Sequence, residues 1–270
     1  MSDFLRQMAA SSAARAVVAK VTWTESDLDK PAHKLRLGEF DLIAEIKDRS
    51  PAEGELAASS GPRAERARMY AKAGAAAISV LTEPDRFDGQ LAHLEEVVRA
   101  VAAEKTPVMR KDFLVDTVQI QEAKAAGASG VLLIIAMLPD ERVRSLLDCA
   151  FDHDLFVLLE SFDEDDWQRS LQLLEVNRYR EKVTCNQFLL GINTRDLRTL
   201  AVDPDRLERF GSMLPQGVTC VAESGQHSAD DAARVAGWGY SASLVGTALM
   251  RAAEPDVLIR DMLLAGRAAS

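Results

Sequence analysis

The sequence has 270 residues, of which 47% are hydrophobic and 6% aromatic, and its formal net charge is −10 at pH 7. This length suits two ordinary domains or one large α/β barrel, and the acidic balance argues against a nucleic-acid partner, which requires a basic surface. No apolar run approaches the roughly 18 residues that span a bilayer, so no membrane partner is expected.

The N-terminal segment and the cysteines bear on the expected location. The segment carries Asp3 and lacks the apolar stretch of a secretory signal, so no signal peptide is predicted. Three cysteines, odd in number and far apart, predict free thiols in a reducing compartment: Cys149, Cys185 and Cys220. We therefore expect a cytoplasmic protein. Its oligomeric state is left open, and the sequence is compatible with a monomer.

In chain order, residues 1–40 precede the first predicted strand and are expected to form an N-terminal helical extension. Its helix should run from Asp3 to about Val21, followed by a polar connector. Eight short apolar segments rich in β-branched residues are then predicted as strands: Leu42–Ile46, Ala77–Leu81, Val108–Arg110, Gly130–Ile135, Phe156–Glu160, Phe188–Ile192, Val218–Glu223 and Ser243–Val245. Most are continuously apolar, as strands buried on both faces of a parallel sheet must be.

The segments between these strands have helical spacing, shown by the apolar stripe of Val143, Leu146, Leu147 and Ala150. Consecutive strands start about 20 to 35 residues apart, which leaves room for a crossover helix each time. No linker rich in Pro, Gly or Ser divides the chain. The sequence therefore predicts an α/β fold, a (β/α)8 TIM barrel that forms a single domain over residues 1–270 with residues 1–40 as its extension.

Polar and charged side chains recur where the predicted strands end, and in this fold those ends meet at the face that carries active sites. A charge inside a low-dielectric barrel is costly unless it is paired. The set is therefore either an ion-pair network of the rim or an active site, and the convergence of so many members favours the active site. The members are Glu45, Lys47, Lys111, Glu160, Asn193, Arg195, Glu223 and Ser224.

Two glycine-containing turns follow the last two strands. Ser224 and Gly225 come after the seventh strand, and Gly246 and Thr247 come after the eighth and open a short helical stretch. Loops at these places form the phosphate site common in such barrels, because glycine lets backbone N–H groups approach the phosphate oxygens. The pair predicts a small anionic, phosphorylated substrate.

No metal or other cofactor is expected. The four histidines occur singly, without the spacing of metal ligands, and no redox-cofactor motif is present.

Six motifs together resemble the indole-3-glycerol phosphate synthases. They are IAEIKDRSPAEG (43–54), ISVLTEPDRFDG (78–89), PVMRKDFLVDTVQIQEAKAAGASGVLLI (107–134), LLGINTRDLRTLAVD (189–203), VAESG (221–225) and LVGTALMR (244–251). The resemblance runs from about residue 41 to 255. It implies a carbon–carbon lyase of tryptophan biosynthesis, which converts 1-(2-carboxyphenylamino)-1-deoxyribulose 5-phosphate to indole-3-glycerol phosphate, carbon dioxide and water.

The resemblance also implies roles for the motif residues. Lys111 is similar to the general acid that protonates the ketose oxygen, and Glu160 to the general base of the dehydration. Lys47 should lie by the phosphate or assist as a second cation, and Arg195 should hold the carboxylate that leaves. The remaining assignments are orientation for Glu45 and Asn193, substrate contact for Ser50, Glu223 and Ser224, and phosphate contact for Ser224, Gly225, Gly246 and Thr247.

Phe87 and Phe113 are candidates for packing on the anthranilate ring and equally for the core. The chemistry agrees with the implied acid: cyclisation places negative charge on an oxygen, and an ammonium stabilises it in a dry pocket. Neighbouring cations and burial are expected to depress the pKa of Lys111 so that it gives up a proton readily.

Three departures from the family pattern stand out. Glu53 takes the place of a lysine common in relatives, and Ser161 and Phe162 replace the usual valine and histidine after Glu160. The segment between Glu160 and Gly191 is longer than usual. These changes bear on rate and pathway role rather than on reaction type.

Two alternatives remain. One is another phosphate-binding barrel that acts on a related phosphorylated aromatic substrate, such as an isomerase with a cysteine and an aspartate at strand ends. The other is a catalytically altered paralogue that binds the ligand without turning it over. No predicted strand ends in that cysteine–aspartate pair, and a pure binder has no use for a matched acid and base.

Overall fold

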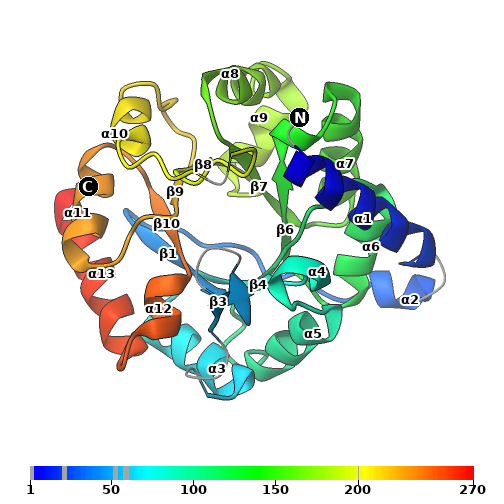
Figure 1. Cartoon of the computed structure of the whole chain (residues 1–270), viewed down its shortest axis with the longest axis horizontal. Helices are drawn as coiled ribbons and strands as arrows, with labels where there is room; N and C mark the ends of the chain where they lie inside the picture. Colours follow the sequence, from blue (N-terminus) through cyan, green and yellow to red (C-terminus); the bar gives the residue numbers. More distant parts are fainter. Residues whose placement is uncertain (1–2, 20–22, 51–53, 57–60, 200) are drawn as a thin grey trace.

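The computed structural model describes residues 3–19, 23–50, 54–56, 61–199 and 201–270. Eight parallel strands form a closed barrel in the order β1-β10-β9-β8-β7-β6-β5-β4 (Figure 1). They are β1 Asp41–Ile46, β4 Ala77–Leu81, β5 Val108–Lys111, β6 Gly130–Ile134, β7 Phe156–Ser161, β8 Phe188–Asn193, β9 Cys220–Glu223 and β10 Ala242–Val245. The predicted (β/α)8 barrel is thereby confirmed.

The strand ends differ from the predicted ones by small shifts. β5, β7 and β8 each extend one residue further, because Lys111, Ser161 and Asn193 continue the ladder with their neighbours. β6 stops at Ile134, since Ile135 begins the 3-10 helix η2, Ile135–Met137. β9 begins at Cys220 rather than Val218.

Helices surround the barrel and follow the strands in turn. Their bounds are α3 Arg63–Ala73, α4 Pro84–Phe87, α5 Leu91–Ala100, α6 Thr117–Ala125, α7 Asp140–Asp152, α8 Glu164–Leu173, α9 Asn177–Thr184, α10 Arg206–Gly211, α11 Ala229–Gly237, α12 Thr247–Arg251 and α13 Pro255–Ala269. Helix α7 shows why they form: acidic residues occupy its first turn, and the predicted apolar stripe is buried. The long segment after Glu160 forms two helices, α8 and α9.

The N-terminal extension forms α1, Asp3–Ala19, and a short helix that the sequence did not predict, α2, Glu25–Leu28. Helix α1 lies along the barrel rim beside α6 (Figure 1). The predicted helix end near Val21 lies outside the described residues. A small hairpin, β2 Arg49–Ser50 and β3 Gly54–Glu55, follows the first barrel strand. Among the described residues, no helix is long and apolar enough to cross a membrane.

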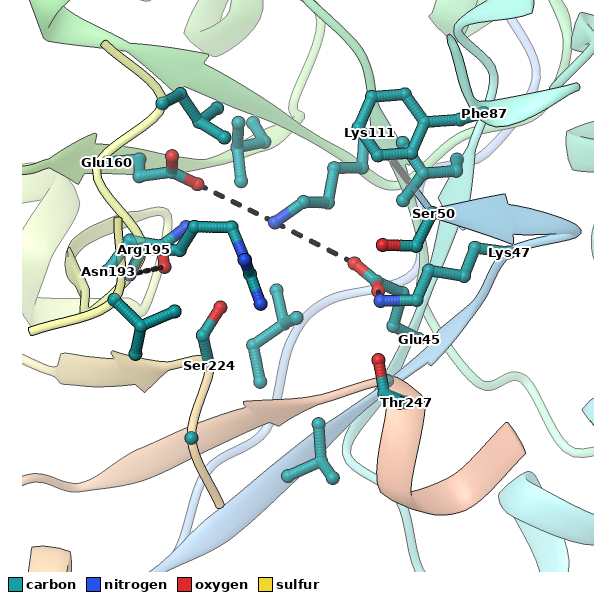
Figure 2. Close-up of a pocket in the computed structure, with 18 of the residues that line it drawn as sticks. Glu45, Lys47, Ser50, Phe87, Lys111, Glu160, Asn193, Arg195, Ser224 and Thr247 are labelled. Atoms are coloured by element: carbon teal, nitrogen blue, oxygen red, sulfur yellow. Dashed lines mark hydrogen bonds and ion pairs between the residues drawn. The ribbon is translucent and has the colours of Figure 1, made fainter. Parts of the chain in front are cut away.

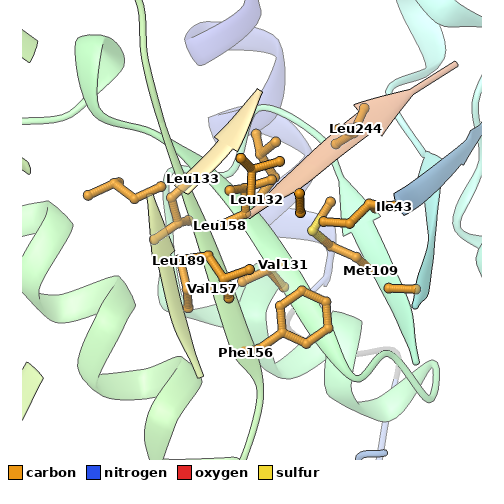
Figure 3. Packing of buried hydrophobic residues seen from close by; sticks show 14 of the residues in the cluster. Ile43, Met109, Val131, Leu132, Leu133, Phe156, Val157, Leu158, Leu189 and Leu244 are labelled. Atoms are coloured by element: carbon orange, nitrogen blue, oxygen red, sulfur yellow. The ribbon is translucent and has the colours of Figure 1, made fainter. Parts of the chain in front are cut away.

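Apolar side chains fill the barrel below the polar strand ends (Figure 3). Phe156, at the start of β7, lies against Gly130 of β6, where an added Cβ would overlap its ring. The fully buried Leu158, Leu189 and Ile43 lie in the same cluster. This packed interior is a rigid platform for the side chains at the carboxyl ends of the strands.

Gly266 of α13 tests how tightly the outer helices dock. A Cβ on Gly266 would overlap the buried ring of Phe40, whereas a Cβ on Gly237, the last residue of α11, meets nothing within 4 Å. Gly266→Ala should therefore lower the free energy of unfolding by about 1–3 kcal/mol through overpacking. Gly237→Ala should leave it unchanged or raise it by about 0.4–1 kcal/mol. Urea unfolding of both variants measures this, and equal stabilities would contradict the packing described for α13.

Candidate active site

A cavity of about 470 Å³ opens at the carboxyl ends of the barrel strands (Figure 2). Its wall includes all the predicted site residues except Glu223, which lies beneath it: Glu45, Lys47, Ser50, Phe87, Lys111, Phe113, Glu160, Asn193, Arg195, Ser224, Gly225, Gly246 and Thr247. The predicted convergence of polar strand ends is therefore what the structure shows. Much of the remaining wall is apolar, as in sites that bind small molecules.

Four charged side chains form one layer inside the barrel. Lys111 of β5 places its Nζ 3.2 Å from Glu223 Oε2 of β9, 3.5 Å from Glu160 Oε2 of β7 and 3.7 Å from Glu45 Oε2 of β1. These are the first, third, fifth and seventh strands of the barrel, and alternate strands contribute the side chains of a layer in this fold. The positions of these residues on alternate strands thus place three carboxyl groups around one cation.

Two glycines make room for this layer, one on β8 and one directly after β10. A Cβ on Gly191 of β8 would overlap Glu223 Oε1, and a Cβ on Gly246 would overlap Glu45 Oε1. Either substitution would displace a carboxylate that contacts Lys111. Gly246, which the sequence assigned to phosphate contact, therefore also has a packing role beside Glu45.

Lys47 neutralises one of the three carboxylates. Its Nζ lies 2.8 Å from Glu45 Oε1. Burial alone would raise the pKa of Glu45, but the ammonium groups of Lys47 and Lys111 outweigh burial and lower it. Glu45 is therefore a firmly ionised carboxylate between two lysines.

The expectation that the pKa of Lys111 is depressed is wrong. Burial does act to lower it, but the carboxyl groups of Glu223, Glu160 and Glu45 outweigh burial and raise the pKa. The reason is that the sequence pattern showed the cations at the strand ends but not which charges lie nearest to one another. The groups in direct contact with the Lys111 ammonium are carboxylates, not the cations Lys47 and Arg195 that would depress its pKa.

The pKa of Glu223 is shifted in the opposite direction to that of Glu45. Burial and the adjacent Glu160 raise the pKa of Glu223 well above its ordinary value, although the Lys111 ammonium opposes them. Within the described residues, Oε1 of Glu223 and Oε1 of Glu160 are buried without a hydrogen-bond partner. The raised pKa favours the protonated form of Glu223 in the folded protein.

The two predicted phosphate turns lie at the cavity mouth. Ser224 and Gly225 have φ values of +64° and +83°, a left-handed pair that glycine adopts easily and serine less so. Thr247 begins α12 and lies beside Lys47 and Glu45, across the cavity from Asn193 (Figure 2). The convergence of these backbone amides on one anion stays a prediction.

Arg195 occupies the opposite side of the cavity from Lys47 (Figure 2). Asn193 Oδ1 accepts a hydrogen bond of 2.9 Å from the backbone N–H of Arg195, which fixes the chain direction as it leaves β8. The guanidinium points into the cavity, and no carboxylate among the described residues forms an ion pair with it. It is the cation on that side of the cavity that is open to an anionic ligand.

Aromatic rings form one wall of the cavity. The ring centroids of Phe87 and Phe113 are 6.2 Å apart, and Phe4 of α1 packs edge-on against Phe113 at 6.0 Å. All three line the cavity, although Phe113 is also part of the buried core. The sequence reasoning missed Phe4, because a single aromatic in a helix remote from the motifs carries no positional signal.

Other lining residues were also missed. Leu197 and Val202 come from the loop after β8, and Gln226 and His227 follow the turn after β9. Their places next to recognised motifs were a usable signal, since residues beside strand ends in a barrel face the site. Glu53, the acidic departure after β1, lies outside the described residues.

No metal centre is evident in the part of the chain that the structure describes, because no three His, Cys, Asp or Glu side chains are arranged to hold an ion. The three thiols are free there, and Cys220 begins β9, at the end of the strand away from Glu223. It therefore cannot serve as the strand-end cysteine of the isomerase alternative.

This chain is similar in sequence to known proteins over nearly the whole barrel. A sequence model of the family described as indole-3-glycerol phosphate synthase matches residues 19–262. The indole-3-glycerol phosphate synthase of Nocardioides sp. is 42% identical over 240 residues, which cover 88% of this chain and 86% of the relative. The protein of the same name from Methanopyrus kandleri is 42% identical over 229 residues, or 84% of each chain.

Solved structures share the architecture. A 3-hexulose-6-phosphate synthase from Salmonella typhimurium superposes with a TM-score of 0.61 at 14% identity, covering 85% of this chain and 100% of that one. A thiamine phosphate pyrophosphorylase from Pyrococcus furiosus gives a TM-score of 0.59 at 15% identity, with 86% and 97% coverage. At these identities the likeness concerns the fold alone.

The raised pKa of Glu223 has a measurable effect on stability. Folded Glu223 keeps a proton that it loses in the unfolded chain above the ordinary pKa of 4.5, so Glu223 destabilises the folded state increasingly as pH rises above that value. Glu223→Gln keeps the shape of the neutral acid and removes this proton uptake. The Tm of the variant relative to wild type should therefore rise between pH 5 and pH 8 in thermal melts.

The matched control is Glu175→Gln, which changes an exposed glutamate. Its Tm difference from wild type should be the same at both pH values. A constant difference for Glu223→Gln as well would show that Glu223 takes up no proton on folding.

Proposed function

The chain belongs to the indole-3-glycerol phosphate synthase family, and we propose that its cavity catalyses the family's ring closure with Lys111 as general acid and Glu160 as general base. The protein is a carboxy-lyase of tryptophan biosynthesis that acts on a phosphorylated substrate. The reaction converts 1-(2-carboxyphenylamino)-1-deoxyribulose 5-phosphate to indole-3-glycerol phosphate, carbon dioxide and water. The observation that carries the proposed roles is the position of the half-buried Lys111 ammonium, which lies among three carboxyl groups at the floor of the cavity.

Lys111 acts in the first step. The aromatic carbon that bears the carboxylate attacks the ketose carbonyl, and the electron pair of the C=O bond moves to oxygen. An alkoxide is a stronger base than an amine, so it takes a proton from Lys111 even though neighbouring carboxylates raise the pKa of that lysine. Until the transfer, the ammonium stabilises the growing negative charge in a site that excludes most water.

Glu160 acts after the substrate carboxylate has left as carbon dioxide and the ring is aromatic again. Loss of water then requires a base to remove a proton while the hydroxyl group departs. Glu160 is 1% exposed, and its Oε1 has no hydrogen-bond partner among the described residues. That oxygen accepts the proton. Lys111, which solvent has reprotonated after the first step, lies 3.5 Å from Glu160 and protonates the departing hydroxyl.

The cations on the two sides of the cavity suit the two anionic ends of the substrate. Lys47 and the turns at Ser224, Gly225, Gly246 and Thr247 are assigned to the phosphate, and Arg195 to the carboxylate that leaves. Glu45 orients Lys111 and Lys47, and Asn193 orients the Arg195 backbone. Ser50 and Glu223 complete the contacts, and the rings of Phe87 and Phe113 form the wall for the anthranilate ring.

We also propose the wider setting of the protein. Residues 1–270 act as a single domain with residues 1–40 as its extension, in the cytoplasm and without a nucleic-acid partner. The net charge of −10 and the unpaired cysteines support this. Lys111 and Glu160, the proposed acid and base, are in contact, which supports turnover of the substrate. An altered paralogue would only bind it.

Two substitutions test the catalytic roles. Lys111→Ala and Glu160→Gln should each lower kcat by about 10²–10⁴-fold, the usual contribution of a positioned acid or base. Glu160→Gln keeps shape, so its KM should change little, whereas Lys111→Ala removes a cation and should also raise KM. Indole fluorescence follows the reaction at a temperature where each variant is folded.

Matched controls are Lys72→Ala and Glu175→Gln, which change exposed residues away from the cavity and should leave kcat as in wild type. Wild-type turnover in either test variant would remove that residue from the mechanism. Wild-type turnover in both would reject the proposed chemistry.

Gly225 tests the phosphate site. Gly225 has a φ of +83°, and a Cβ there would meet nothing nearer than Thr194 Oγ1 at 3.5 Å, so Gly225→Ala introduces backbone strain without a clash. The strained turn should reorient its N–H groups and weaken competitive inhibition by inorganic phosphate by about tenfold, or about 1.4 kcal/mol.

Gly217→Ala is the matched control, because Gly217 has a φ of +73° with open space around it and does not line the cavity. It should cost similar stability and leave the inhibition constant of phosphate unchanged. Equal inhibition constants in both variants would place the phosphate elsewhere.

A further inference from the structure

The loop between β8 and α10 bears on the orientation of Arg195. It folds back on itself through a bridge between Arg195 and Val202, and the N–H of Asp196 donates to the carbonyl of Ala201 at 2.9 Å. Arg195, Leu197 and Val202 of this loop line the cavity. The direction of the Arg195 guanidinium thus depends on how the whole loop is anchored.

Arg198 lies on the same loop and makes the densest set of polar contacts in it. Its Nε and one terminal nitrogen donate to the two carboxylate oxygens of Asp196 at 3.0 and 2.9 Å, a two-pronged pair. The backbone N–H of Arg198 also donates to Asp196, at 2.8 Å. These contacts hold both the side chain and the backbone of Arg198 against the carboxylate of Asp196.

The remaining nitrogen of Arg198 reaches a different part of the barrel. It lies 2.6 Å from Asp163 Oδ2 and 3.7 Å from Asp166 Oδ2, at the start of α8. The guanidinium also lies over the ring of Phe162, 5.7 Å from its centroid. Phe162 and Asp163 directly follow β7, the strand that carries Glu160 near its end.

We propose that Arg198 is a positioning residue that fixes the Arg195 loop to the turn after the Glu160 strand, and so sets the direction from which Arg195 meets the substrate carboxylate. This inference rests on the carboxylate-binding role proposed for Arg195. Arg198 itself lies outside the cavity lining. It acts on the substrate through Arg195 alone.

Three features support a geometric role over simple charge pairing. The pair with Asp196 is two-pronged, the third nitrogen pairs with carboxylates at the start of α8, and the guanidinium lies over an aromatic ring. Lysine can supply the charge but cannot make these contacts together.

The experiment is a double-mutant cycle on steady-state kinetics with Arg195→Ala, Arg198→Ala and the double variant, at a temperature where all are folded. Without the anchor, binding is weakened equally in the ground state and in the transition state. Arg198→Ala should therefore raise KM about tenfold and change kcat less than threefold. In the double variant KM should match that of Arg195→Ala, because the two residues act in series.

Arg198→Lys distinguishes geometry from charge. Its KM should stay near that of Arg198→Ala, while restoration of the wild-type KM would overturn the proposal. Arg178→Ala is the matched control, since Arg178 also joins two carboxylates, Asp148 and Asp152, but lies away from the cavity. It should leave KM unchanged.

Asp163→Asn covers the case in which Arg198→Ala does not fold. Asp163 caps α8, and asparagine caps equally well, so the helix stays intact while the ion pair to Arg198 is lost. KM should again rise with kcat nearly unchanged, and a wild-type KM would overturn the anchor.

The outcomes separate this inference from the function on which it rests. A raised KM in Arg195→Ala with a wild-type KM in Arg198→Ala, or additive effects in the cycle, overturns the positioning role alone. A wild-type KM in Arg195→Ala shows that the carboxylate role of Arg195 is wrong, and the inference is rejected with it.

Discussion

The Lys111 ammonium, with three carboxyl groups within 3.7 Å, is the contact on which the site depends. A buried cation is tolerated only with partners, and buried carboxylates need the cation in turn. The barrel meets this requirement because alternate strands point one side chain each into a common layer. Gly191 on β8 and Gly246 directly after β10 leave the space that the carboxyl groups of Glu223 and Glu45 occupy.

Arg110 and Asp112, the residues on either side of Lys111, make contacts that hold the end of β5. Asp112 accepts hydrogen bonds from both terminal nitrogens of Arg15 at 2.8 Å and from the Thr82 hydroxyl at 2.7 Å, and it also pairs with Arg110. These partners outweigh burial and lower the pKa of Asp112 to about 2. Arg15 belongs to α1, so the N-terminal helix is tied to the end of the strand that carries Lys111, just as Phe4 ties it to the aromatic wall.

The pattern of residue types in the sequence was sufficient to predict the barrel and most of the cavity. The physical reason differs from residue to residue. Strands buried on both faces are continuously apolar, so charges such as Glu45 and Glu160 at their ends stand out against that background. Phe4 and Arg15 could not be found in this way, because their roles depend on where a helix docks across nearly a hundred residues of sequence. The pKa of Lys111 was predicted in the wrong direction, since its sign depends on distances within the layer that strand order alone does not determine.

Charge balance explains how an acidic site accepts a substrate with two anionic groups. Three ionised glutamates beside Lys111 would repel such a ligand, but the raised pKa of Glu223 favours its neutral form. The ammonium groups of Lys47 and Lys111 then face fewer negative charges, and Arg195 adds a further cation on the other side of the cavity. In its neutral form Glu223 fills the space beside Gly191 and still contacts Lys111, so it supports the layer without adding a negative charge.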